Sequence, residues 1–359
     1  MATLPFYWSD VEPERGKPRY EKDSPKIYRR PPIDLCIEFC EKYGIEPREH
    51  ALAYEHFFPS WLRNADVDEI KREFERRCSE ISERYADKIP TIEVTNELLW
   101  ESKYVAVPSI YEEPDYLDFA FSLAKKYFPK NQLAINEAPM VWRENARTTD
   151  HYYAYTEAAI RRGARIDAIG MQYHLFCKQD EIYEKTRKYL SPEWLYRHMD
   201  LYARFGKPLQ VTEITIPAFS NDPEDEAVQA ELLEWLYSIW FSHPSMEQII
   251  YWNLVDGYAW VSDPAKIKDS QGDMTIGENV YYGGLFRFDM TPKPAFHALQ
   301  NLIRKKWHTE AELATDADGC AKMRGFYGTY EITVETESGT KTREISLSKN
   351  GDNNVELII

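Results

Sequence analysis

The sequence predicts an α/β fold, a (β/α)8 barrel of the TIM type, followed by a small antiparallel β-module. Short apolar runs alternate with amphipathic helical stretches, an order typical of a parallel sheet covered by helices. Seven strands precede the last helix, one fewer than a closed barrel needs. They lie at TLPFYW, HALAY, TIEVT, QLAIN, IDAIGMQ, LQVTE and IIYWNL.

The sequence pattern changes near residue 310. Residues 1–310 carry the barrel pattern, whereas residues 311–359 alternate apolar and polar positions in YEITV, REISL and NVELII. Turn signals at Ser338-Gly339 and Asn350-Gly351 separate these runs. We therefore expect a barrel domain over 1–310 and a β-module of two or three strands over 311–359.

Composition excludes several classes of partner. The formal net charge is −16 and no basic stripe stands out, which argues against binding to nucleic acid or to an anionic membrane surface. No apolar run approaches the ~18 residues of a membrane span. The five cysteines have no second Cys or His pair at ligand spacing, so the sequence indicates no metal site and, weakly, a reducing compartment.

Two carboxylates stand where strand-like runs end. Glu97 ends the third strand and Glu213 the sixth. In a parallel barrel the carboxyl ends of the strands form the active face, and strands three apart face each other across it. Retaining glycoside hydrolases need two carboxyl groups about 5–5.5 Å apart. Other strand ends or the loops after them supply candidate companions, namely His50, Asn96, Gln172, His174, Trp252 and Trp260.

Several motifs in order resemble glycoside hydrolase family 10, the retaining endo-β-1,4-xylanases. They are TNE, IDAIGMQYHL, VTEITIP, YWNLVDGYAW and LFRFDMTPKPAFHAL, and the resemblance covers most of the chain. It implies double-displacement cleavage of internal β-1,4 linkages in xylan or decorated xylo-oligosaccharides. It also implies that no metal or organic cofactor is needed.

The resemblance implies a role for each candidate residue. Glu97 corresponds to the acid/base and Glu213 to the nucleophile, while Asn96 would bond the 2-hydroxyl of the reacting sugar. The remaining implied substrate contacts are His50, Tyr54, Gln172, His174, Trp252 and Trp260. Glu213 must be ionised to attack, and Glu97 must hold a proton.

The chain also departs from the family pattern. Leu4 and Tyr7 stand where the family has Asn and Lys, and Tyr54 and Phe57 replace Trp and Gln. In the family, the Asn and Lys at the positions of Leu4 and Tyr7 hold the sugar one unit beyond the reacting ring, so we expect a remodelled glycone side. Thr215 replaces the Asp that normally orients the histidine beside the nucleophile.

The opening run TLPFYW aligns with the second strand of the family barrel. We therefore expect that an upstream segment supplies the first strand. No signal-peptide pattern follows Met1, which suggests a cytoplasmic protein only if Met1 is the true start.

Two other functions remain open at this stage. Another β-1,4-glycanase of the same barrel superfamily, such as a glucanase or mannanase, would share the carboxylates. A non-catalytic carbohydrate-binding barrel is the rival from a different class. The altered sugar contacts favour it slightly, whereas Asn96, Glu97 and Glu213 oppose it. Oligomeric state, side-chain preference and the choice between endo and exo action are not predicted.

Overall fold

The computed structural model describes residues 1–101, 109–143, 150–182, 184, 187–262, 272–349 and 351–356. The chain forms two compact units, Met1–Ala295 and Phe296–Ile359. The domain boundary that the sequence places near residue 310 stays a prediction.

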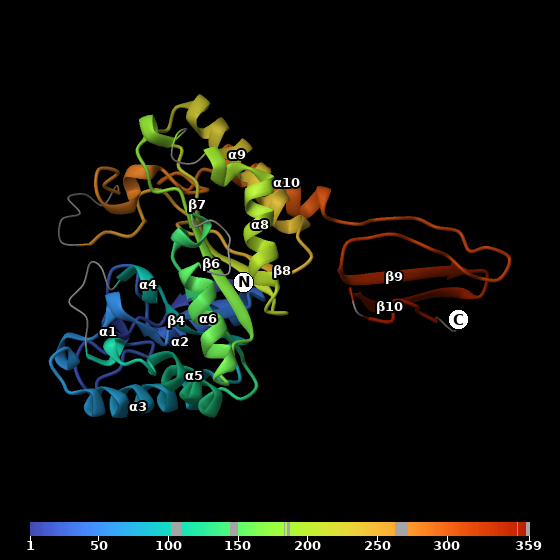
Figure 1. Ribbon diagram of the computed structural model, residues 1–359. Coiled ribbons are helices and arrows are strands. Elements are labelled where there is room, and N and C mark those ends of the chain that lie inside the picture. The colour runs from blue at the N-terminus through green and yellow to red at the C-terminus, as the bar shows by residue number, and fades with distance from the viewer. Residues whose placement is uncertain are drawn as a thin grey trace. The chain divides into compact units, whose positions relative to one another are not determined.

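A curled parallel sheet forms the centre of the first unit (Figure 1). Its order is β1-β2-β4-β5-β6-β7-β8, and β3 pairs with the far end of β4. Within the described residues the pairing runs from β1 to β8, and no ladder joins those two strands. The strands are β1 (Ala2–Pro5), β2 (Pro47–His50), β3 (Ala53–Tyr54), β4 (Thr91–Asn96), β5 (Gln132–Glu137), β6 (Ala168–His174), β7 (Leu209–Thr215) and β8 (Met246–Ile249).

Helices follow the strands and cover the outside of the sheet, as the alternating sequence pattern predicts. In Figure 1, α3 and α5 lie side by side along one flank. The α-helices are α1 (Trp8–Val11), α2 (Ile33–Tyr43), α3 (Val67–Tyr85), α4 (Leu98–Glu101), α5 (Tyr116–Tyr127), α6 (His151–Arg161), α8 (Pro192–Ala203), α9 (Pro223–Ser242) and α10 (Pro294–Asn301). No helix in the described ranges combines the length and apolar character needed to cross a membrane.

Short helical turns occupy several connections. The 3-10 helices are Glu55–Phe57, Ser60–Leu62, Ser109–Glu112, Pro139–Trp142, Gln179–Glu181, Arg187–Leu190 and Gly277–Tyr281, and a π-helix spans Leu302–Lys306. Most of those in the first unit follow the carboxyl end of a strand, where loops of a barrel carry its site.

Helix α3 shows how the sequence specifies this layer. The Asp66 side chain caps its first turn by accepting from Glu69 N at 2.7 Å. Ile70, Phe74 and Cys78 recur at a helical spacing and are fully or almost fully buried. The remaining face is charged and meets solvent.

The central strands are buried on both faces and pair in parallel, which confirms the predicted parallel sheet. Every residue of β4, β6 and β7 is buried, including the charged side chains Glu93 and Glu213. The run IIYWNL is shifted from its prediction, because β8 ends at Ile249. Trp252 N still donates to Ile214 O of β7 at 2.8 Å, and Asn253 then takes a φ of 62° that ends the extended course.

In the second unit, β9 (Gly328–Thr336) and β10 (Gly339–Leu347) form an antiparallel hairpin. Its two-residue turn lies at Glu337 and Ser338, one residue before the predicted Ser338-Gly339 pair, because Gly339 is already the first residue of β10. The third run, NVELII, forms no strand over residues 354–356, and residues 357–359 lie outside the described part of the chain.

Candidate active site

The backbone turns sharply where β4 ends. Asn96 is the last residue of β4, and Glu97 follows with a φ of 54°, in the left-handed region that few non-glycine residues adopt. Glu97 N donates to Asn136 O of β5 at 3.2 Å, which holds the turn against the sheet. Such a conformation aims a side chain that a regular strand would point elsewhere.

One amide joins the two predicted carboxylates. Gln172 Nε2 of β6 donates to Glu97 Oε1 at 2.7 Å and to Glu213 Oε1 at 3.0 Å. The two oxygens can therefore be no further apart than the sum of those distances. The register of β6 against β7 shifts between Met171 and Tyr173, at Gln172. Bulges of this kind often re-aim a side chain beside a site.

Each carboxylate has a further partner of its own. Tyr54 donates its hydroxyl to Glu97 Oε2 at 2.9 Å. His174 Nε2 lies 3.5 Å from Glu213 Oε2, and its Nδ1 contacts Thr215 Oγ1 at 2.9 Å. Thr215 therefore occupies the orienting position beside this histidine with a hydroxyl in place of a carboxylate.

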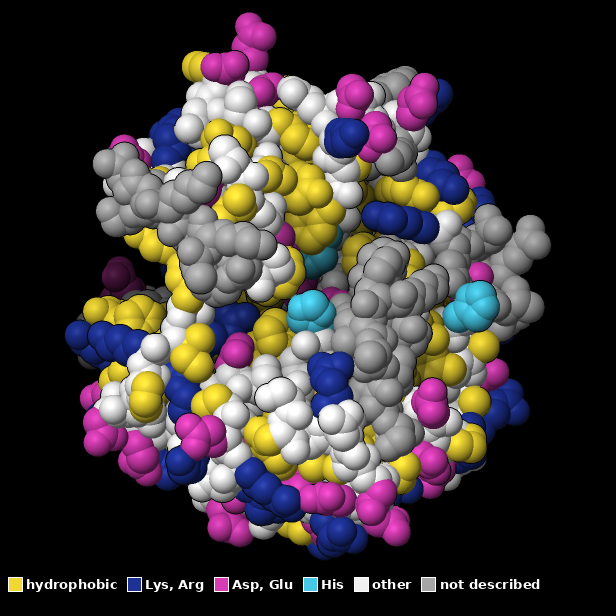
Figure 2. Space-filling view, turned by 90° about the vertical axis from the view of Figure 1, so that its left-hand side faces the viewer, with side chains coloured by type: hydrophobic (Ala, Val, Ile, Leu, Met, Phe, Trp, Pro, Cys, Tyr) yellow, Lys and Arg dark blue, Asp and Glu magenta, His cyan; other side chains and the backbone are white. Residues whose placement is uncertain are grey.

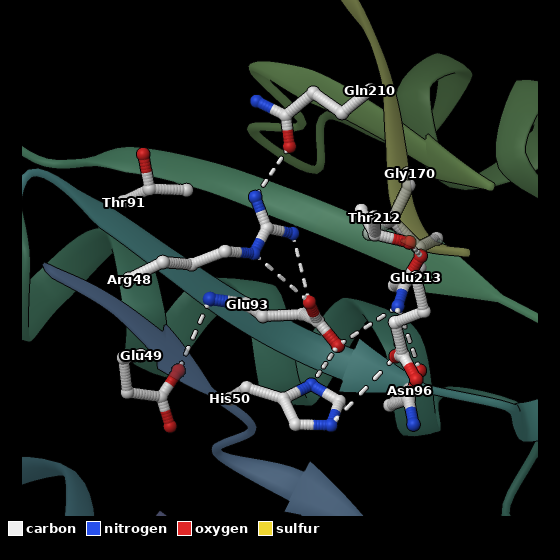
Figure 3. A network of polar contacts seen from close by, with 12 residues as sticks. Arg48, Glu49, His50, Thr91, Glu93, Asn96, Gly170, Gln210, Thr212 and Glu213 are labelled. Carbon is white, nitrogen blue, oxygen red and sulfur yellow. Dashed lines mark hydrogen bonds and ion pairs between the residues drawn. The ribbon is translucent and has the colours of Figure 1, made fainter. Parts of the chain in front are cut away.

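A buried ion network lies beneath Glu213 (Figure 3). His50 Nδ1 contacts Glu93 Oε1 at 2.7 Å, and His50 Nε2 lies 3.8 Å from Glu213 Oε1. Arg48 Nη2 donates to Glu93 Oε2 at 2.8 Å, and Arg48 Nη1 donates to Gln210 Oε1 at 2.5 Å. Arg48, Glu93 and His50 are at most 2% exposed. Arginine, glutamate and imidazole thus form a chain that ends at Glu213.

The charges in this chain shift one another's titration. Burial alone would lower the pKa of His50, but the Glu93 and Glu213 carboxylates outweigh it and raise that pKa above its usual value. Burial alone would raise the pKa of Glu93, but His50 and Arg48 outweigh it and lower that pKa. Both shifts favour an imidazolium beside ionised Glu93.

Asn136 of β5 connects the network to Asn96 and Glu213. Its Nδ2 lies 2.9 Å from Asn96 Oδ1, 3.2 Å from Glu93 Oε1 and 3.3 Å from Glu213 Oε1. Its Oδ1 accepts from Thr212 Oγ1 at 2.7 Å. A Cβ at Gly170 would lie only 2.5 Å from this Oδ1, so the glycine leaves room for the amide.

Sequence reasoning missed Arg48, Glu93 and Asn136 as members of the site. For two of them the signal was a polar residue inside an apolar run, namely Glu93 in TIEVT and Asn136 in QLAIN. The structure buries both completely or almost completely.

One group of three residues in the described chain has the donors for a metal ion. The ligand atoms of His50, Glu93 and Glu213 lie within 4.8 Å of one another. Arg48 already supplies a cation to Glu93, and His50 bridges the two carboxylates. Hydrogen bonding and charge pairing therefore account for this geometry.

The two predicted tryptophans differ in position. The ring centroid of Trp252 lies 6.1 Å from that of His50 and 6.2 Å from that of His174, so this indole borders the carboxylates. Trp252 Nε1 donates to Glu278 Oε2 at 3.0 Å. Trp260 instead contacts the His56 ring, at 5.7 Å, on the side of the site next to β3.

The structure brings most of the predicted site residues into one cluster. They are His50, Tyr54, Asn96, Glu97, Gln172, His174, Glu213 and Trp252. Trp260 joins this cluster through His56. The individual roles of these residues stay predictions.

A cavity of about 440 Å³ adjoins the cluster at His174. Figure 2 views the side of the molecule on which α1 and α4 lie in Figure 1, and this face is hollowed where histidines meet hydrophobic side chains. The cavity is lined by Pro139, Trp142, Arg143, Tyr173, His174, Leu175, Phe176, Cys177, Glu184, Lys188 and Tyr189. Aromatic rings with a few polar groups are a lining typical of small-molecule binding sites.

The fold and this pair of carboxylates define a class of barrel hydrolase. The profile of glycosyl hydrolase family 10 matches residues 8–302, so the chain belongs to that family. This confirms the resemblance that the motifs indicate.

Known proteins with similar sequences and folds extend the comparison. The chain is 25% identical over 329 residues to anti-sigma-I factor RsgI6 of Acetivibrio thermocellus, covering 91% of this chain and 36% of that protein. It is 24% identical over 266 residues to endo-1,4-beta-xylanase B of Cellvibrio japonicus, covering 74% of this chain and 40% of that protein. The chain thus spans well under half the length of these curated relatives. Xylanase 10B from Thermotoga petrophila RKU-1, solved with xylobiose, aligns with a TM-score of 0.64 at 20% identity, covering 85% and 86% of the two chains.

Proposed function

We propose that this chain is a retaining glycoside hydrolase that cleaves β-1,4-xylan or decorated xylo-oligosaccharides by double displacement. The observation that carries the proposal is the Gln172 amide nitrogen shared by Glu97 Oε1 and Glu213 Oε1 at 2.7 and 3.0 Å. A separation bounded by these distances falls below the ~6.5–9.5 Å of inverting enzymes, which need room for a water.

In the first step a Glu213 oxygen attacks the anomeric carbon while the glycosidic C–O bond breaks. Glu97 gives its proton to the departing oxygen, and a glycosyl ester of Glu213 remains. In the second step Glu97 takes a proton from water, the water oxygen bonds the anomeric carbon, and Glu213 leaves as a carboxylate.

The surrounding residues suit these steps. His50 Nε2 lies 3.8 Å from Glu213 Oε1, and the raised pKa of His50 favours an imidazolium, which places a positive charge beside the proposed nucleophile. Asn96 Nδ2 is buried without a hydrogen-bond partner among the described residues, although its Oδ1 accepts from Asn136. A sugar hydroxyl would satisfy this donor, and an unmet buried donor costs about 1–3 kcal/mol.

We propose xylan as the substrate class because several relatives carry the name endo-1,4-beta-xylanase and a similar structure holds xylobiose. A glucanase or mannanase activity of the same barrel superfamily is the alternative within this chemistry. Cleavage at internal linkages is the expectation from the resemblance to endo-acting enzymes.

A second candidate is carbohydrate binding without catalysis. Two observations favour it: the changed residues Leu4, Tyr7 and Phe57, and a relative whose name is that of an anti-sigma factor. Against it, Glu97 and Glu213 keep an arrangement suited to double displacement.

Incubation with arabinoxylan, glucuronoxylan, cellulose and mannan, followed by a reducing-sugar assay, tests the proposal. We expect release from the xylans, and proton NMR of early products should show the β-anomer first. An α-anomer would refute retention. Release from cellulose or mannan alone would assign the alternative substrate. Binding to xylan with no release from any polymer would establish the non-catalytic candidate.

A further inference from the structure

The two carboxylates divide the mouth of the sheet into two halves. Glu97 follows β4 and Glu213 lies on β7, so the ends of β5 and β6 lie on one side of the pair. The ends of β1, β2, β3 and β8 lie on the other side. A linear sugar chain cleaved between the carboxylates extends over both halves if both are open.

The half next to β5 and β6 contains the 440 Å³ cavity. His174, at the end of β6, belongs both to this cavity and to the contacts of Glu213. Its ring stacks on Phe176 at 4.6 Å, and Phe176 stacks on Tyr281 at 4.8 Å. Sugar units can therefore continue from the catalytic pair into a space with aromatic surfaces.

The opposite half is filled by an aromatic barrier, which we define as Tyr7, Tyr54, His56, Phe57 and Trp260. The Tyr7 and Phe57 rings stack with centroids 3.9 Å apart and planes 13° apart, and Tyr7 is only 3% exposed. The ring centroids of Tyr54 and Phe57 lie 5.3 Å apart, and the Tyr54 hydroxyl donates a hydrogen bond to Glu97. The barrier therefore begins at the carboxylate itself.

Cations and cross-contacts hold the barrier in place. The Arg30 guanidinium lies 4.4 Å from the Tyr7 ring centroid and pairs with Asp10 at 2.9 Å. The ring centroids of His56 and Trp260 lie 5.7 Å apart, and this contact connects the β3 side to the loop after β8. Arg29 Nη2 donates to Asn253 Oδ1 at 3.1 Å and makes a second connection across the same gap.

From this asymmetry, and resting on the proposed function, we propose that the enzyme acts at chain ends. The reacting sugar lies beside Trp252, His50 and Asn96, and the barrier blocks the chain beyond it. The rest of the substrate occupies the half next to β5 and β6. This differs from the internal cleavage expected from the family resemblance.

Xylohexaose carrying a fluorophore at its reducing end tests the inference with the unmodified full chain. We expect one early labelled product, because cuts occur at one position counted from one end. On soluble arabinoxylan, viscosity should fall little for each reducing end formed. Early labelled products of several lengths, with a rapid loss of viscosity, would overturn chain-end action and leave the proposed hydrolase intact. Absence of any cleavage would overturn both.

A variant tests whether the barrier is the cause. Phe57→Ala removes the half-buried ring that stacks on Tyr7, and should raise the share of internal cuts several-fold. Phe39→Ala is the matched control, because Phe39 is 57% exposed on α2 and lies outside the barrier. If Phe57→Ala folds with its melting temperature within the range of the control and yields an unchanged product ladder, the barrier is not the determinant. If it fails to fold, the ladder of the unmodified enzyme still decides the proposal.

Discussion

Replacing Tyr54 by Phe is expected to move the alkaline limb of the pH–rate profile to higher pH. The Tyr54 hydroxyl donates to Glu97 Oε2 at 2.9 Å, and Gln172 donates to the other oxygen at 2.7 Å. A donor favours the ionised form of a carboxyl group, so its loss makes the proton of Glu97 harder to remove.

The size of this shift follows from the strength of the bond. A hydrogen bond to a charged group contributes about 1.5–3 kcal/mol. A pKa shift of one unit corresponds to about 1.4 kcal/mol. Because Tyr54 and Glu97 are both half-buried, solvent weakens the interaction, and we expect the low end, a shift of roughly one unit upward.

The measurement is kcat/KM on a xylo-oligosaccharide as a function of pH for the unmodified enzyme and Tyr54→Phe. Tyr43→Phe, in which an exposed ring of α2 loses its hydroxyl, is the control. Melting temperatures confirm that both variants are folded. The reasoning is refuted if Tyr54→Phe leaves the alkaline limb in place and changes KM alone.

The other predictions concern the two carboxylates proposed to be catalytic and one buried acid. Glu213→Ala should lose nearly all activity and recover it with azide as the α-glycosyl azide; a β-azide product would reverse the assignment. Glu97→Ala should impair natural substrates but spare aryl glycosides with good leaving groups, and equal loss on both would contradict its role. Burial raises the pKa of Glu49 from 4.5 to about 8, so the folded chain holds a proton that the unfolded chain releases, and stability falls as pH rises through that window. Glu49→Gln should reduce this fall by on the order of 4 kcal/mol, measured as the difference in unfolding free energy between pH 5 and pH 9 in urea. An equal fall in unfolding free energy for the two proteins would disprove it.

The fold and the strand-end positions of the two carboxylates could be predicted because their signals are local. A buried strand followed by a helix has a period that a short window contains. Glu97 directly follows such a strand, and Glu213 lies near the end of another. The end of β8 was less predictable. The apolar run continues to Leu254, but Asn253 leaves the extended conformation to reach Glu278, a partner 25 residues away.

The support of the site could not be predicted, because its partners are distant in the sequence. Arg48 and Gln210 are 162 residues apart, and Asn136 meets Glu213 across 77 residues. The sequence shows that Glu93 is a charge within an apolar run. Only the pairing of β2 with β4 shows that it meets Arg48 and His50 rather than a surface lysine.

The buried network connects these distant residues to the proposed division of roles between the two carboxylates. Arg48 balances Glu93, and the His50 imidazolium, favoured by its raised pKa, balances Glu213. The four charges sum to zero when Glu213 is ionised. Ionising Glu97 as well would put a second carboxylate on the same Gln172 nitrogen, and like charges at this distance disfavour that state. In the proposed mechanism Glu213 loses its charge when it becomes a glycosyl ester, so Glu97 can then lose its proton and serve as the base of the second step.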